Sequence, residues 1–205
     1  MLAHAAADPL PPPSSGLRRR PPGAAELSDP LFHPMPLRGA PAHEWLRERG
    51  GHTDADPAFA LVGQEAQVEG VQLRRIWHTA GSVHFESDVW SDPDVVSLLL
   101  PLQGAFTIAR RDARAIVGRG CFAALPAGAA ATISTSSPTA RLTLLTRPSG
   151  GIPPLVGLVV STSPAVPVLI AAANAVLDAR LSAGDPAIDG LRTALQGLAA
   201  AVLSG

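Results

Sequence analysis

Cysteine is almost absent from this sequence. The single cysteine, Cys121, excludes a disulfide within the chain and any zinc site built from several cysteines. No histidine and no run of basic residues adjoins Cys121, so a buried, unreactive thiol is favoured over a reactive one. Sparing use of cysteine is consistent with a reducing compartment, and we expect a cytoplasmic protein.

The sequence also lacks an excess of charge and a long apolar run. Arginine supplies all sixteen basic residues, and with seventeen acidic residues the net charge is −1, which does not mark a free-standing nucleic-acid binder. No apolar run approaches the roughly 18 residues that span a bilayer. Arg18–Arg20 precede Pro21 and Pro22 rather than the apolar core of an export signal. We therefore expect no direct contact with DNA and no membrane association.

The 205 residues, 46% of them apolar, are enough for one domain with a sizeable core. Residues 1–36 are rich in Pro and Arg and are predicted to be a disordered lead, because they cannot bury enough apolar area to offset chain entropy. Residues 37–148 carry strand patterns and are predicted to form a barrel. Residues 149–205 are predicted to be a linker and two helices.

Short apolar runs separated by turn residues predict antiparallel strands between residues 59 and 146. Arg111-Asp112-Ala113 predicts a hairpin tip, because Asp bonds its own backbone in turns. In the strand over residues 70–78, side chains alternate between two faces. One face carries Val71, Leu73, Arg75 and Trp77, and the other carries Gln72, Arg74, Ile76 and His78. The predicted fold class is mainly β with C-terminal helices, as a sandwich or barrel of seven or eight strands.

The string G-x5-P-x-G formed by Gly120, Pro126 and Gly128 resembles the second sequence motif of the cupin superfamily of small β-barrels. With Pro101-Leu102-Gln103-Gly104 ahead of it, the stretch resembles more narrowly the N-terminal effector-binding and dimerisation domain of AraC-type transcription regulators. The resemblance implies a cupin-like (double-stranded β-helix) barrel followed by a two-helix dimerisation segment. The C-terminal helix-turn-helix domain of those regulators has no counterpart in the sequence given.

Comparison with the cupin motifs also implies that this barrel holds no metal and no other cofactor. Ala131 stands where the second motif places a His, Ser97 stands where the first places a Glu, and no His occurs near residues 90–93. His78, His84 and Glu86 form the nearest alternative set of ligands. Ordinary polar strand residues are the favoured interpretation of these three.

As the resemblance implies, a small-molecule effector would bind inside the barrel, against apolar walls with a few polar groups. The candidate interior residues are Arg75 and His84 as polar anchors, together with Trp77, Leu98, Leu100, Phe106, Ile108 and Phe122. Each of them also fits an ordinary place in the core.

The last helical pattern begins at Asp185-Pro186 and repeats apolar residues at spacings of 3, 4, 3 and 4. Its members are Ile188, Leu191, Leu195, Leu198 and Val202. A narrow seam of this kind pairs with another helix, which predicts a homodimer. Packing on the barrel or on the preceding helix explains the seam equally well.

The primary hypothesis is a non-enzymatic, small-molecule-sensing and dimerisation domain of an AraC-type regulator, lacking its own DNA-binding module. One alternative is a stand-alone, metal-dependent cupin enzyme that acts on a small metabolite through His78, His84 and Glu86. Another is a truncated chain that pairs with full-length relatives and blocks them.

Overall fold

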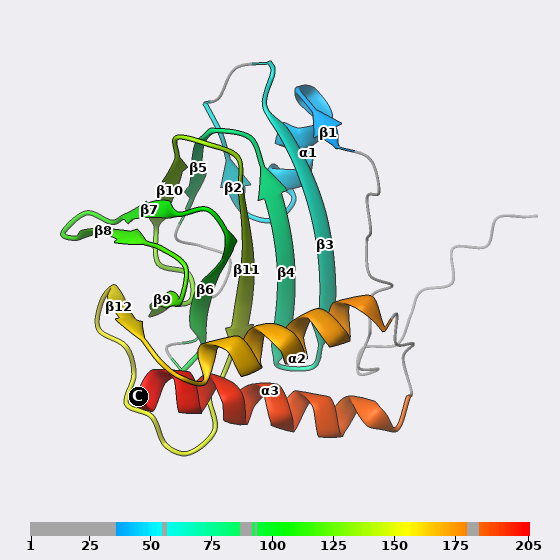
Figure 1. The fold of residues 1–205 in the computed structure, drawn as a ribbon, viewed down its shortest axis with the longest axis vertical. Helices are drawn as coiled ribbons and strands as arrows, with labels where there is room; N and C mark the ends of the chain where they lie inside the picture. Colours follow the sequence, from blue (N-terminus) through cyan, green and yellow to red (C-terminus); the bar gives the residue numbers. More distant parts are fainter. Residues whose placement is uncertain (1–35, 55–56, 87–91, 93, 180–184) are drawn as a thin grey trace, which may run out of the picture.

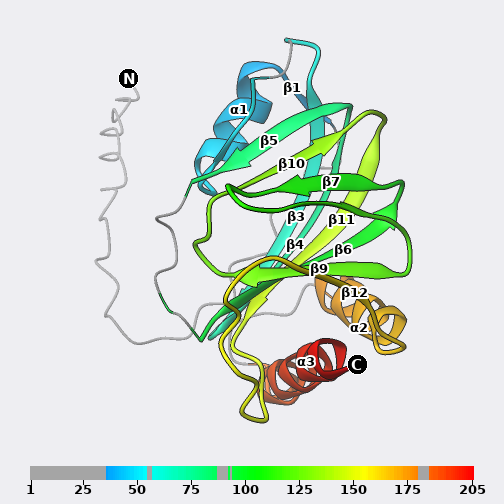
Figure 2. The ribbon, with the colours of Figure 1, turned by 90° about the vertical axis from the view of Figure 1, so that its left-hand side faces the viewer.

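The computed structural model describes residues 36–205 apart from 55–56, 87–91, 93 and 180–184. In this part of the chain, two antiparallel sheets face each other, and two helices cover the outer face of the larger sheet (Figures 1 and 2). The predicted fold class, mainly β with C-terminal helices, is therefore confirmed. The predicted lead lies outside the described residues except for Pro36.

The larger sheet has seven strands in the order β1-β3-β4-β11-β6-β9-β12. Every neighbouring pair in it is antiparallel. Its strands are β1 (Leu37–Arg38), β3 (Ala60–Val68), β4 (Val71–His78), β6 (Val96–Gln103), β9 (Cys121–Pro126), β11 (Thr139–Thr146) and β12 (Val159–Thr162). Two of them, β1 and β12, were not predicted, because each is a short edge strand without a clear alternating pattern.

The smaller sheet has five strands in the order β2-β5-β10-β7-β8. They are β2 (Gly51–His52), β5 (Gly81–Phe85), β7 (Phe106–Ala109), β8 (Arg114–Val117) and β10 (Ala131–Thr135). The predicted hairpin tip after Arg110 is confirmed: Ala109 pairs with Arg114, and the Arg110 backbone N–H donates to the Ala113 carbonyl at 2.7 Å.

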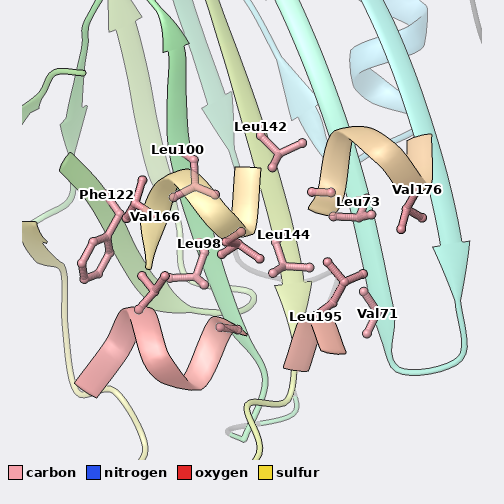
Figure 3. Packing of buried hydrophobic residues seen from close by; sticks show 14 of the residues in the cluster. Val71, Leu73, Leu98, Leu100, Phe122, Leu142, Leu144, Val166, Val176 and Leu195 are labelled. Atoms are coloured by element: carbon pink, nitrogen blue, oxygen red, sulfur yellow. The ribbon is translucent and has the colours of Figure 1, made fainter. Parts of the chain in front are cut away.

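The helices α2 (Val166–Asp178) and α3 (Ala187–Ser204) lie side by side across the outer face of the larger sheet (Figure 1). A single apolar cluster joins them to that face, and Figure 3 shows Leu98, Leu100 and Leu144 of the sheet beneath the two helices. Burying a side chain of this size contributes roughly 1.5–3 kcal/mol. Burial on this scale fixes the helices to the sheet.

The space between the two sheets holds two further apolar clusters. The short helix α1 (Ala40–Arg47) belongs to one of them, with Trp45 and Leu46 buried against the interior face of β3. Gly63 of β3 makes this approach possible, because a Cβ built there would lie 2.3 Å from the Trp45 ring. The larger sheet is thus covered on both faces, by helices outside and by the smaller sheet and α1 inside.

Candidate functional site

A cavity of about 90 Å³ lies between the two sheets. Most of its wall is apolar and includes Ile76, Phe85, Leu99, Ile108, Leu125, Ile133 and Leu145. Polar side chains gather in the remaining wall: Arg49, Gln72, Arg74, Glu86, Ser97 and Thr143. Apolar walls with a few placed polar groups are typical of small-molecule sites, although those for drug-sized ligands are larger, at roughly 300–1,000 Å³.

The β3–β4 hairpin places a charged pair beside this cavity. Its two-residue turn, Glu69-Gly70, suits a tight hairpin because Gly70 has φ +73°. The turn sets Val68 opposite Val71 and therefore Glu65 opposite Arg74. Both side chains point to the interior, on the face opposite Val71 and Leu73.

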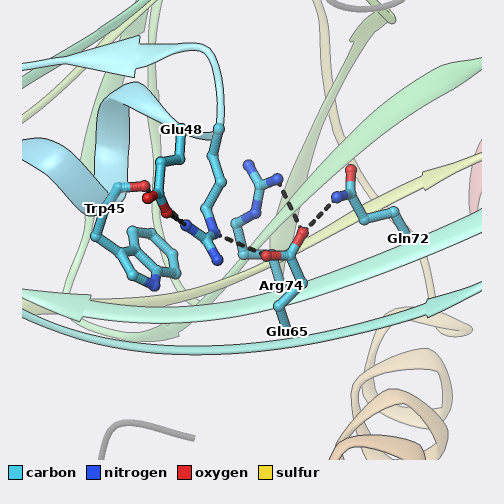
Figure 4. A network of polar contacts seen from close by, with 6 residues as sticks. Trp45, Glu48, Glu65, Gln72 and Arg74 are labelled. Carbon is cyan, nitrogen blue, oxygen red and sulfur yellow. Dashed lines mark hydrogen bonds and ion pairs between the residues drawn. The ribbon is translucent and has the colours of Figure 1, made fainter. Parts of the chain in front are cut away.

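Glu65 is the centre of a polar network (Figure 4). Arg49 Nε donates to Glu65 Oε2 at 2.7 Å, and Arg74 Nη2 donates to Glu65 Oε1 at 3.1 Å. The Gln72 amide donates to the same Oε1. Arg49 also donates to the Trp45 carbonyl at 3.0 Å and stacks over the Trp45 ring at 4.1 Å. The network ties the cavity wall to helix α1.

Electrostatics keep both members of the charged pair ionised. Burial by itself would raise the pKa of Glu65, but Arg74 and Arg49 lower it below its ordinary value. Burial lowers the pKa of Arg74, as does the charge of Arg49, whereas Glu65 raises it. The carboxylate therefore acts as the counter-ion of two guanidinium groups.

A second buried guanidinium lies further along the interior face. Arg141 of β11 is fully buried and donates to His78 Nε2 at 2.5 Å, while His78 Nδ1 donates to the Thr79 carbonyl at 2.7 Å. These contacts define a neutral His78. Burial, reinforced by the charge of Arg141, lowers the pKa of His78 to about 4. Burial, with the charge of Arg74, also lowers the pKa of Arg141 to about 10.

The structure corrects most of the predicted barrel-interior residues. Only Ile108 lines the cavity, and Phe106 packs near it between the sheets. Leu98, Leu100 and Phe122 face α2 and α3 instead. Arg75 is on this outer face too, where it bonds Asn174 and Asp178 of α2, and Trp77 is two residues further along the same face. Alternation gave the two faces correctly, but the face assigned to the interior was the wrong one.

His84, predicted as a polar anchor, also lies on an outer face. It is held there by Thr132 Oγ1 at 3.0 Å, by Asp54 at 3.2 Å and by stacking on His52. His78 points to the interior, so the alternative ligand set of His78, His84 and Glu86 is not brought together. In the described part of the chain, no three His, Cys, Asp or Glu side chains converge as ligands of a metal ion.

The predicted dimer seam of α3 packs within its own chain. Leu195 and Val202 are buried against α2 and the sheet, and Leu191 and Leu198 pack partly against the same cluster. Ile188 is half-buried. The alternative interpretation of the seam is thus the one observed, because α2 and the sheet offer these side chains an apolar surface. Homodimerisation remains a prediction without this seam to support it.

Sequence reasoning missed Arg49, Gln72, Arg74, Ser97 and Thr143 as cavity residues, and it missed Glu65 as the partner of Arg49 and Arg74. One signal could have found two of them. Glu69-Gly70 is a two-residue hairpin turn, and counting back from it pairs Glu65 with Arg74. Arg49 joins them through tertiary packing of α1, which has no signature in the sequence.

Comparison with solved structures supports this architecture. The AraC-like transcriptional activator CuxR is similar at a TM-score of 0.60 with 12% identity, over 83% of this chain and 70% of that one. The fold is cupin-like. Ylba from E. coli matches at a TM-score of 0.39 with 12% identity, over 69% of this chain and 56% of its own. A putative glyoxylate-induced protein from Pseudomonas aeruginosa matches at 0.38 with 15% identity, over 54% and 44%.

No protein-family model and no curated protein matches the sequence. The likeness to CuxR therefore supports the fold alone and leaves the function to be argued from the site. None of the helices in the described residues is long and apolar enough to cross a membrane.

Proposed function

We propose that this chain is the small-molecule-sensing domain of an AraC-like transcription regulator, non-enzymatic and acting in the cytoplasm. The cavity between the sheets, with its buried polar network around Glu65, is the observation that carries the proposal. The likeness to CuxR supports it, because it extends over 83% of the chain. An effector would bind in the cavity and shift the population of arrangements that α2 and α3 adopt.

The β3–β4 pair offers a physical route for that shift. Arg74 lines the cavity and bonds to Glu65, while their chain neighbours Gln64 and Arg75 face α2. Gln64 donates to the Leu177 carbonyl at 2.6 Å, and Arg75 donates to Asp178 at 2.7 Å. A change in the strand positions at the cavity would therefore reach the C-terminal end of α2 through adjacent residues.

A thermal-shift screen against a library of small metabolites tests the proposal. A ligand that binds only the folded state stabilises that state by about 2.7 kcal/mol when its concentration is 100 times its Kd. A true effector therefore raises the melting temperature in a concentration-dependent way. The screen is repeated with Ala131→Leu, which places extra carbons in the cavity wall. Ala130→Leu adds the same carbons at an exposed neighbouring position and is the matched control.

The expected result is a hit that stabilises the wild type and Ala130→Leu but not Ala131→Leu. A library without hits, or hits equally strong in Ala131→Leu, would overturn the assignment of this cavity as an effector site. Circular dichroism of the free variants confirms that Ala131→Leu, which risks overpacking, is still folded.

A further inference from the structure

The interior of the barrel carries more positive than negative charge. Arg49, Arg74 and Arg141 all point inward. Among the described residues, Glu65 is the one carboxylate of the interior that bonds to any of them. Glu48, the other partner of Arg49, is an exposed residue of the surface. Arg141 has no carboxylate partner in the described part of the chain, and neither its Nε nor its Nη2 bonds to anything there. Buried cations are costly unless they are paired.

Arg74 brings this excess charge to the cavity. Arg74 is one of the residues that line the wall, and it is 7% exposed. Nη2 reaches Glu65, a carboxylate that Arg49 and Gln72 also use, and Nε has no hydrogen-bond partner among the described residues. A buried donor left without an acceptor is rare, because it has lost its bonds to water. The cavity wall thus lacks an anionic hydrogen-bond acceptor for Arg74 Nε.

Gln72 adds an unused acceptor to the same cavity wall. Its amide nitrogen must face Glu65, because the carboxylate only accepts, and this orientation fixes the amide oxygen on the other side. That oxygen is buried and unbonded within the described residues. A ligand oxygen that receives a bond from Arg74, together with a hydroxyl that donates to Gln72, would satisfy both groups.

We propose that the ligand of this cavity is a small organic carboxylate, whose carboxylate oxygens accept hydrogen bonds from Arg74 and whose short apolar body packs against Leu99, Ile108 and Ile133. The proposal rests on the proposed function and specifies its ligand class. A carboxylate supplies the missing acceptor and a counter-charge, and guanidinium binds carboxylate in a fixed fork geometry. The cavity of about 90 Å³ suits a compact acid rather than a nucleotide.

Glu86 also lines the cavity and would repel an anion if it were close and desolvated. Its side chain is 80% exposed and faces His52 at 3.7 Å. Its charge is therefore screened by water and lies toward solvent. Arg74, by contrast, is buried, so its attraction for an anion dominates inside the cavity.

Matched acid and amide probes test this inference. Butyrate is compared with butyramide, and benzoate with benzamide, in titrations of the full chain followed by NMR shifts of the Leu99, Ile108 and Ile133 methyl groups. Each acid is expected to bind about tenfold more tightly than its amide, because a hydrogen bond to a charged group is stronger than a neutral one.

Two variants change the wall charge in opposite directions. Arg74→Gln should lose the preference for acids, and Glu65→Gln should bind acids more tightly than the wild type, because the resident counter-ion is removed. Arg114→Gln removes a charge from an exposed position on β8 and should leave the preference unchanged. Should Arg74→Gln prove unstable, Glu65→Gln and the probe pairs still decide the matter.

Amides that bind as tightly as the acids would overturn the carboxylate assignment and leave the sensing proposal intact. The carboxylate assignment is also overturned if neither class shifts the cavity methyl groups, or if Glu65→Gln weakens the binding of acids. The sensing proposal itself fails only if the metabolite library also returns no cavity ligand.

Discussion

At the scale of single residues, Gly63 shows how closely helix α1 approaches the sheet. Adding a Cβ at this position would place it 2.3 Å from Trp45 Cζ2, so the indole ring or the backbone must move. We expect Gly63→Ala to lower the free energy of unfolding by about 1–3 kcal/mol, as overpacked cores do. Urea unfolding measures this. Gly118→Ala is the control, since nothing lies within 4 Å of its added Cβ, and an equal loss in both variants would contradict the packing argument.

His78 makes the stability of the folded protein depend on pH. Its pKa is about 4 in the folded protein against 6.5 when unperturbed, so between these values the unfolded chain binds a proton that the folded chain does not. Stability should therefore fall as pH falls from about 6.5 to 4, by about 3 kcal/mol in all, at 1.36 kcal/mol per pKa unit. His78→Gln keeps an acceptor for Arg141 and should lose this slope.

Denaturant unfolding at a series of pH values measures the effect as the difference between wild type and His78→Gln. Acidic groups such as Glu65 titrate in both proteins and cancel from that difference. Parallel pH profiles for the two proteins would show that His78 is not held neutral by its surroundings.

At the scale of elements, α3 packs against α2 and the larger sheet of its own chain. Leu195 of α3 is 1% exposed and packs in the apolar cluster that joins α2 and α3 to the larger sheet. Leu195→Ala should cost about 2–5 kcal/mol of unfolding free energy, and the midpoint should not change with protein concentration. Leu198→Ala removes the same carbons from a half-buried position and should cost less. A midpoint that rises with protein concentration would instead place Leu195 in a subunit interface.

At the scale of the whole molecule, the larger sheet separates the cavity from the helices, and the consecutive β4 residues Arg74 and Arg75 contact the cavity and α2 respectively. Ligand binding at Arg74 should therefore change hydrogen-exchange protection at the C-terminal end of α2, around Asn174 to Asp178. Arg75→Gln weakens the contacts of the strand with α2 and should reduce that change while the ligand still binds. Exchange measured with and without benzoate tests this, and unchanged protection of α2 in the wild type would remove the proposed route.

Much of this architecture follows from local sequence. Alternation divides β4 into its two faces, Asp112 lies at a hairpin tip and the run of short apolar segments gives a mainly β fold. These features depend on neighbouring residues, whose backbone preferences and side-chain directions are fixed over a few positions. The Glu69-Gly70 turn belongs with them, since it alone pairs Glu65 with Arg74.

The tertiary structure decided which face became the interior and what α3 packs against. Because helices cover one side of the larger sheet and the smaller sheet covers the other, both faces of its strands are buried, and a two-residue period cannot tell them apart. Leu98 and Leu99 are equally apolar neighbours, yet one meets the helices and the other the cavity. The heptad pattern of α3 likewise predicts that its apolar residues pack against another apolar surface, but it does not say which one. In the folded chain, that surface is α2 and the larger sheet.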